Sequence, residues 1–123
     1  MMDRIEGKPI FDSDDMLDRL GGDEEFLDDV LEVFIDECPK MLEGLRRGVT
    51  EGNAREIERA AHTMKGALLN ISADPAAGIV VVLETMARDN DLEKSIEVFS
   101  ALELAMGQLE HELQTFRARA ALG

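Results

Sequence analysis

The chain has 123 residues, the length of one domain, and its 27 acidic against 13 basic side chains give a formal net charge of −14. This charge disfavours binding of nucleic acid through a basic surface, and it disfavours adhesion to an anionic membrane. Hydrophobic residues make up 45% of the sequence, which is enough for a folded core and argues against disorder.

The expected compartment follows from features that the sequence lacks. Cys38 is the single cysteine, so no internal disulfide can form, which fits a reducing compartment. No run of roughly 18 apolar residues is present, and the first residues lack the basic and apolar regions of a signal peptide. We therefore expect a cytoplasmic protein without a membrane span, and the high net charge favours a monomer.

The N-terminal part is predicted to hold an arm and one short helix. Residues 1–12 show no sustained hydrophobic period and form the arm. Ser13 is expected to cap a short helix over residues 14–20, whose first turn is acidic. Gly21 and Gly22 should end this helix.

The second predicted helix is long and lies between Asp23, its N-cap, and Gly52, its C-terminal stop. Pro39 lies inside the pattern and should kink the helix near residue 35, where it removes a backbone hydrogen bond, rather than end it. Apolar residues recur at intervals of three and four along the segment: Phe26, Leu27, Val30, Leu31, Phe34, Cys38, Met41, Leu42, Leu45 and Val49.

A third and a fourth helix are predicted to follow. Asn53 caps the third, which should end near Ser72 and Ala73. Asp74 followed by Pro75 indicates the start of the fourth, with an N-cap and then proline at the first helical position. The apolar stripe of the third helix comprises Ile57, Ala61, Met64, Leu68 and Ile71, and that of the fourth comprises Ile79, Val80, Leu83 and Met86.

The last predicted helix follows a loop at residues 88–90 and is capped by Asp91. Its apolar residues have the average spacing of about 3.5 that is typical of antiparallel bundles. They are Leu92, Ile96, Phe99, Leu102, Met106, Leu109, Leu113 and Phe116. We therefore predict an all-α fold, an up-down antiparallel four-helix bundle with an additional short N-terminal helix, over residues 13–120.

The third helix presents a polar group of chemical interest on its exposed face. At 100° per residue, His62 lies about 140° from the core stripe, and Lys65 is one turn further along the same face. Gly66 stands four residues after the histidine, although glycine inside a helix costs about 1 kcal/mol relative to alanine. Its use would be clearance, because another surface can then approach the imidazole closely. Leu69 adds an apolar residue that suits a docking patch.

These residue types point to phosphoryl chemistry. An exposed neutral imidazole is a competent nucleophile near neutral pH, and an ammonium at i+3 can offset the charge of a phosphoryl group on the ring. Arg55 and Arg59 make this face less acidic than the molecule as a whole, and Glu58 partly cancels that effect.

The other histidine and the cysteine have ordinary interpretations. His111 has Gln114 at i+3 and Thr115 at i+4, so neither companion is present, and we interpret it as a surface residue. Cys38 is expected to be a core residue of the kinked helix rather than a redox group.

Residues 61–66, Ala-His-Thr-Met-Lys-Gly, resemble the A-H-x-[LM]-K-G signature of histidine-containing phosphotransfer (HPt) domains. The likeness extends over roughly residues 14–118. It includes the family's pattern on the preceding helix and its later L-E and A-R-x-x-D-L-E stretch, which here are Phe26-Leu27, Phe34, Pro39, Leu42, Leu45, Leu83-Glu84, Ala87-Arg88 and Asp91-Leu92-Glu93.

The resemblance implies a phosphoryl carrier of a two-component multistep phosphorelay. His62 would accept the group from a receiver-domain aspartyl phosphate and pass it to another receiver aspartate. Lys65 would stabilise the phosphoryl group, and Gly66 would give the receiver access. The partners would be response-regulator receiver domains or a hybrid sensor histidine kinase, docked around Leu69, Arg55, Arg59 and Glu58. The receiver supplies Mg²⁺, so no metal or cofactor is expected on this chain.

Two departures from the family pattern are present. The family commonly has Gly-Ala ten residues after the histidine, where this chain has Ser72 and Ala73, so the end of the histidine helix is left open. Leu68 and Leu69 replace small residues that often follow Lys-Gly, which predicts a more apolar docking surface and a different choice of partner.

Alternatives remain at the level of sequence. A fragment carrying the phosphotransfer domain of a chemotaxis-type histidine kinase would share the H-x-x-K-G core. Unless the chain is such a fragment, the absence of a following kinase-like segment favours a stand-alone carrier. A helical module that binds a receiver domain without phosphotransfer would use the same face. A di-iron bundle is disfavoured because Arg59 and Gln108, not glutamates, stand three residues before His62 and His111. The absence of a G-x-x-x-x-G-K-[ST] loop disfavours autonomous kinase activity.

Overall fold

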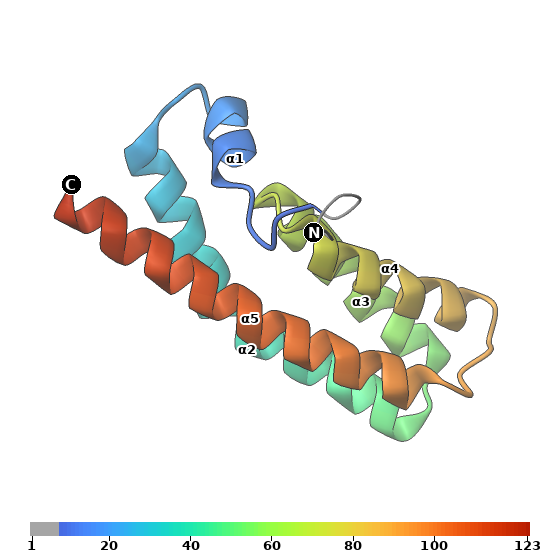
Figure 1. Ribbon diagram of the computed structural model, residues 1–123. Helices are drawn as coiled ribbons and strands as arrows, with labels where there is room; N and C mark the ends of the chain where they lie inside the picture. Colours follow the sequence, from blue (N-terminus) through green and yellow to red (C-terminus); the bar gives the residue numbers. More distant parts are fainter. Residues whose placement is uncertain (1–7) are drawn as a thin grey trace, which may run out of the picture.

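The computed structural model describes residues 8–123, and these residues form five helices and no strand (Figure 1). The helices are α1 (Ser13–Arg19), α2 (Glu24–Glu51), α3 (Ala54–Asn70), α4 (Asp74–Arg88) and α5 (Ser95–Leu122). Each long helix packs against the next along the chain, and α5 packs back against α2. The predicted fold class, an up-down antiparallel four-helix bundle with an additional short N-terminal helix, is confirmed.

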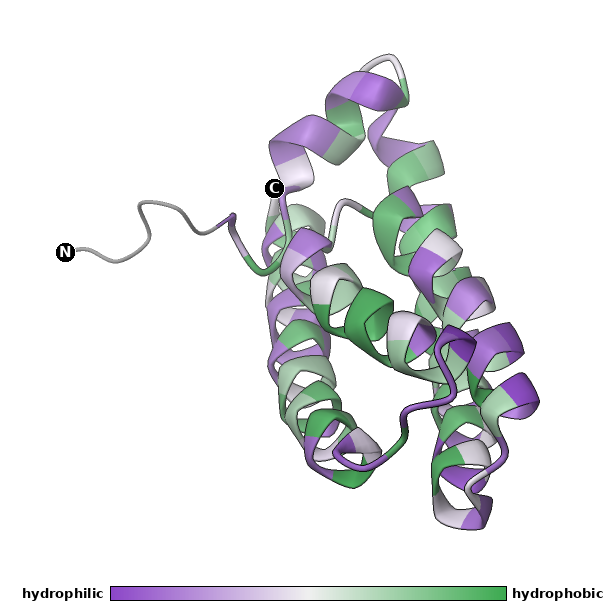
Figure 2. Ribbon diagram, turned by 90° about the vertical axis from the view of Figure 1, so that its right-hand side faces the viewer, coloured by the Kyte–Doolittle hydropathy of each residue, from purple (hydrophilic) through white to green (hydrophobic). Residues whose placement is uncertain are grey.

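The core is built from the stripes that face the bundle axis, and Figure 2 shows that the long helices carry both hydrophobic and hydrophilic sides. The predicted stripe of α3 is confirmed, since its members are at most 1% exposed: Ile57, Ala61, Met64, Leu68 and Ile71. Phe26 and Ile96 were predicted on core stripes but are 50% and 67% exposed. Both lie in the first turn of their helices on a side that faces away from the core, whereas the adjacent Leu27 and Ser95 are buried.

Several helix ends agree with the sequence. The Asp23 carboxylate accepts a hydrogen bond from the Phe26 N–H (3.0 Å), and the Asn53 side chain accepts one from the Glu56 N–H (3.2 Å), so both predicted N-caps are confirmed. Gly52 ends α2 in the left-handed conformation, with φ of 63°. Helix α2 continues through Pro39, as predicted.

The predicted caps of α1 and α4 were wrong by one residue. Asp12, not Ser13, caps α1, because its carboxylate reaches the Asp15 N–H at 3.0 Å. At α4, Ala73 takes the N-cap position and Asp74 is already helical. The connection between α3 and α4 is short, because Ser72 adopts a left-handed φ of 59° and the Ala73 N–H donates to the Leu68 carbonyl at 2.9 Å.

The predicted Asp91 cap of the last helix was also wrong, because α5 begins only at Ser95. The Asp91 N–H is used to close the end of α4, where it donates to the Met86 carbonyl at 2.9 Å. Asn90 adopts a left-handed φ of 56° at the same turn. The connection therefore includes residues 89–94 instead of ending at residue 90.

Hydrogen bonds hold helix α1 and the residues before it against the C-terminal end of α3. The Arg19 guanidinium donates to the Leu69 and Asn70 carbonyls, both at 3.1 Å, and to Ser72 Oγ. These bonds satisfy carbonyls that would otherwise lack partners at the end of a helix. Residues 1–7 of the predicted arm lie outside the described residues. In the rest of the arm, the Phe11 ring packs edge-on against the Phe116 ring, with the ring centroids 5.3 Å apart.

None of the helices in this described part of the chain is long and apolar enough to cross a membrane.

Candidate functional site

His62 lies on the exposed face of α3, as the helical periodicity predicts. Its neighbours Ala61 and Met64 are fully buried and fix the orientation of the helix against the core. The imidazole itself is 71% exposed. A nucleophile at this position is therefore held on a rigid element and is open to a partner of macromolecular size.

A buried carboxylate from α4 contacts both polar residues of the α3 face. Glu84 Oε2 lies 3.0 Å from His62 Nδ1, and Glu84 Oε1 lies 2.9 Å from Lys65 Nζ. The Glu84 side chain is only 5% exposed, and that of Lys65 is 27% exposed. Arg88, one turn further along α4, places Nη2 3.5 Å from Glu84 Oε2. We call His62, Lys65 and Glu84 the histidine cluster.

The histidine cluster fixes which ring nitrogen is free. An ionised carboxylate can only accept hydrogen bonds, so Nδ1 of His62 must carry the proton that points at Glu84. In the neutral ring, Nε2 then carries the lone pair. In that form of the ring Nε2 can attack an electrophile, and the carboxylate behind the ring can balance a positive charge that develops on it.

Hydrogen bonds hold the buried carboxyl group of Glu84 in its charged form. The bond from Lys65 lowers the pKa of this carboxyl most, burial opposes that effect by raising it, and the bond from His62 lowers it further. The net result is a pKa below the ordinary value of 4.5. Glu84 is therefore a carboxylate at neutral pH despite its burial.

We expect the stability contributed by the Glu84 charge to depend on pH. Because its folded pKa lies below 4.5, the contribution is present above that pH and is lost as the pH falls through the folded value. At neutral pH, the free energy of unfolding of wild type should be larger than that of Glu84→Gln, with a gap of about 1.5 kcal/mol between them. In urea unfolding measurements, the gap at an acidic pH below 4.5 should be smaller than the gap at neutral pH.

A matched control for this pair is Glu112→Gln, which changes an exposed carboxylate on α5 and should leave stability nearly unchanged at both pH values. A gap between wild type and Glu84→Gln that is the same at both pH values would show that the carboxylate is not held in its charged form by the fold.

Gly66 faces open space next to His62. A Cβ built at this position would meet no heavy atom within 4 Å outside its own helix. No neighbouring element therefore requires a glycine here, and the clearance predicted from the sequence is present. Leu69, further along α3, is exposed.

The charged residues predicted around His62 share one shallow hollow with it. Arg55, Glu58 and Arg59 line this hollow together with His62 and Glu84. The Arg59 guanidinium is already engaged by Glu56 one turn before it, with Nη2 2.6 Å from Oε1. Glu58 lies 3.6 Å from the Arg88 Nε. Arg55, which is exposed, has no ion pair among residues 8–123.

Sequence reasoning missed Glu84 and Arg88 as members of the site. Both fall within motifs that support the family resemblance, but the role of neither was predicted. A usable signal was present, because Val80, Leu83 and Ala87 define the buried face of α4 and Glu84 lies on it. An acid on a core-facing stripe needs a partner, and residues of the adjacent helix are the nearest candidates.

The remaining candidates stand apart from the histidine cluster. His111 is exposed on α5 and makes no ion pair within the described residues, in keeping with a surface residue. Burial raises the pKa of the Cys38 thiol to about 11, so the reactive thiolate is disfavoured at neutral pH. Residues 8–123 contain no group of three or more His, Cys, Asp or Glu side chains that could hold a metal ion.

Comparison with known proteins places this geometry in context. The model of the Hpt domain family matches residues 29–118 of the chain. Among solved structures, the chain is similar to histidine-containing phosphotransfer protein B (HptB) from Pseudomonas aeruginosa PAO1, with a TM-score of 0.83 and 22% sequence identity. That match covers 92% of this chain and 98% of the other, and it shows a shared fold. A search of curated proteins found no match.

Proposed function

Because the chain belongs to the Hpt domain family, whose members are histidine phosphotransfer proteins, we propose that His62 is the phospho-acceptor of a multistep phosphorelay. His62 would receive the phosphoryl group from the aspartyl phosphate of one receiver domain and pass it to the aspartate of another. The observation that supports this best is the exposed imidazole with its Nδ1 3.0 Å from the buried Glu84 carboxylate.

In the proposed step, the Nε2 lone pair attacks the phosphorus of the aspartyl phosphate. An N–P bond forms, the bond between phosphorus and the aspartyl oxygen breaks, and the aspartate leaves as a carboxylate with the electron pair. The proton on Nδ1 stays in its hydrogen bond with Glu84, whose negative charge balances the positive charge gained by the ring. Return of the phosphoryl group to a second aspartate reverses these changes. Mg²⁺ and the acidic pocket are expected on the receiver, so the proposed carrier needs no cofactor or autonomous kinase activity.

Lys65 is proposed to stabilise the phosphoryl group. An ammonium has three donors, so Nζ can keep its 2.9 Å bond to Glu84 and still donate to a phosphoryl oxygen. Lys65→Ala should slow phosphoryl uptake by about 10-fold, since one charge-assisted contact is lost. Lys65→Arg, which keeps the charge, should retain most of the rate in time courses of transfer. Equal rates for wild type and Lys65→Ala would show that Lys65 does not contribute to phosphoryl transfer.

The surface around Gly66 is proposed to dock the receiver. A groove between α2 and α3 begins beside the histidine at Thr63 and is lined mainly by apolar side chains, including the exposed Phe26 and Val33. Leu69 extends this apolar surface on α3, while Arg55, Glu58 and Arg59 form a charged border on the other side of His62. Apolar contact with a charged border is the usual composition of a transient interface.

The proposal is tested by direct transfer. The protein is mixed with a panel of Asp-phosphorylated receivers and Mg²⁺, and its intact mass is measured under non-acidic conditions. The expected result is an added phosphoryl group that is labile in acid and stable in base. Receivers that form a complex with the folded protein without transferring phosphate would instead indicate a binding-only module. The carrier is further proposed to act as a cytoplasmic monomer, in keeping with its net charge of −14 and its single cysteine.

A further inference from the structure

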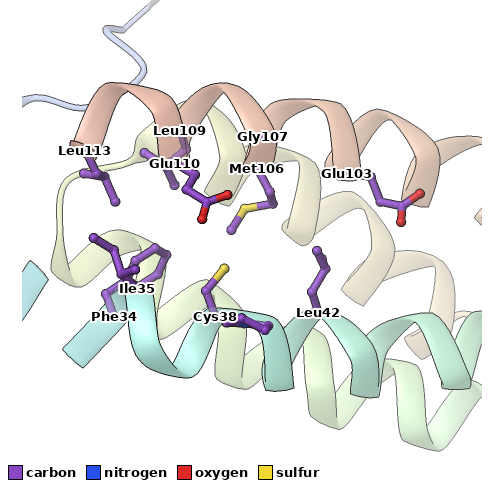
Figure 3. Close-up of a pocket in the computed structure, with 11 residues that line it drawn as sticks. Phe34, Ile35, Cys38, Leu42, Glu103, Met106, Gly107, Leu109, Glu110 and Leu113 are labelled. Carbon is purple, nitrogen blue, oxygen red and sulfur yellow. The ribbon is translucent and has the colours of Figure 1, made fainter. Parts of the chain in front are cut away.

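A slot lies between α2 and α5 (Figure 3). In the bundle it is opposite the α3–α4 seam that holds the histidine cluster. Its volume of about 310 Å³ is at the lower limit of the range for small-molecule sites. The residues at its walls are mostly apolar. From α2 they include Phe34, Cys38 and Leu42, and from α5 they include Met106, Leu109 and Leu113.

Two residues that limit packing lie on opposite walls of the slot. Pro39 is on the α2 wall and has no N–H, so the Ile35 carbonyl in the same wall lacks its usual helical donor. Gly107 is on the α5 wall, where a Cβ would meet no heavy atom within 4 Å. Neither residue sends a long side chain across the seam.

The two charged side chains of the slot, Glu103 and Glu110, are carboxylates, which only accept hydrogen bonds. Figure 3 shows the Glu110 carboxylate and the Cys38 sulfur pointing into the space between the two helices. Glu110 forms no ion pair within residues 8–123, whereas Glu103 at the other end of the slot is paired with Arg46. One uncommitted negative charge therefore stands at the border of an apolar space. An anionic ligand would be repelled both by this charge and by the net charge of −14.

We propose that this slot binds a small apolar molecule carrying an ammonium group, with its hydrocarbon body between α2 and α5 and its nitrogen beside Glu110. The aromatic and aliphatic side chains of the walls provide the contact area, and the Glu110 carboxylate favours a ligand with a positive charge. The site is independent of the proposed phosphotransfer, because the slot and His62 lie on opposite seams of the bundle. Binding there leaves the histidine face free.

Three probes with the same phenyl body test the proposal: phenethylamine, 2-phenylethanol and 3-phenylpropionate. Each is titrated into the ¹⁵N-labelled full chain near neutral pH, and amide shifts are followed by NMR. Phenethylamine should bind with a Kd on the order of 1 mM, given its few heavy atoms, and should shift residues 34–42 and 103–113. The alcohol should bind about threefold more weakly, and the acid should not bind measurably.

Matched variants test whether the Glu110 charge and the open space of the slot are needed for binding. Glu110→Gln should weaken phenethylamine about threefold, to the level of the alcohol, whereas Glu112→Gln on the same helix should not. Gly107→Leu adds a side chain at the slot wall and should weaken binding of the amine and the alcohol to a similar extent, and it should fold because its Cβ meets nothing.

Equal affinity for all three probes, shifts outside the slot, or an effect of Glu112→Gln equal to that of Glu110→Gln would overturn the proposal, as would the absence of any binding. Phosphoryl uptake is not a readout in these experiments, so their failure and that of the proposed function are distinguishable.

Discussion

Replacing His62 with glutamine should abolish phosphoryl uptake. The amide of glutamine has no nucleophilic lone pair comparable to that of Nε2, so a loss of more than about 1000-fold is expected. The fold should be unaffected, because the imidazole is 71% exposed and a glutamine amide can still donate to Glu84. Time courses of transfer from a phosphorylated receiver, with unfolding curves recorded in parallel, measure both quantities.

The chain offers a matched control in its second histidine. His111 is exposed on α5 and belongs to neither the histidine cluster nor its hollow, so His111→Gln should take up phosphate at the wild-type rate. If His111→Gln lost uptake while His62→Gln retained it, the assignment of the acceptor would be wrong.

Gly66→Leu should separate stability from transfer. A side chain at this position projects into open space, and leucine favours helix more than glycine does, so the variant should be more stable by up to about 1 kcal/mol. The same side chain would stand one turn from His62 and keep the receiver away from it. We expect transfer to fall by at least about 100-fold, because misplacement of reacting groups by about an ångström has an effect of that size.

Gly78→Leu is the control for this prediction. Gly78 is an exposed glycine of α4 where an added Cβ would meet no heavy atom within 4 Å, so the variant gains the same helix propensity away from the histidine. It should match Gly66→Leu in its effect on stability and wild type in its rate of transfer. Undiminished transfer by Gly66→Leu would mean that clearance at residue 66 is not needed.

Most of the fold could be predicted because its signals are local and periodic. The stripe of α3 was correct at every position, since residues spaced by three and four must share a helix face. The predicted Asp91 cap was wrong, because hydrophobic periodicity gives no information about the turn at this position. The backbone at this connection closes the end of α4, with Asn90 left-handed, and no hydrophobic pattern determines where such a turn ends.

The site was predictable only as far as it lies on one helix. His62, Lys65 and Gly66 could be placed together because their relative angles follow from helix geometry. Glu84 comes from the adjacent helix, and the contact with His62 depends on how α3 and α4 slide and rotate against each other. A single sequence gives no measure of that register. The contact was therefore visible only in the structure.

The most direct test of the proposed mechanism is ¹⁵N NMR of the His62 ring before and after phosphoryl transfer. We expect the proton on Nδ1 in the unmodified neutral ring, because Glu84 accepts it, and the phosphoryl group on Nε2 after transfer. A phosphoryl group on Nδ1, or on any residue other than His62, would contradict the central claim that the buried carboxylate on α4 leaves Nε2 as the acceptor.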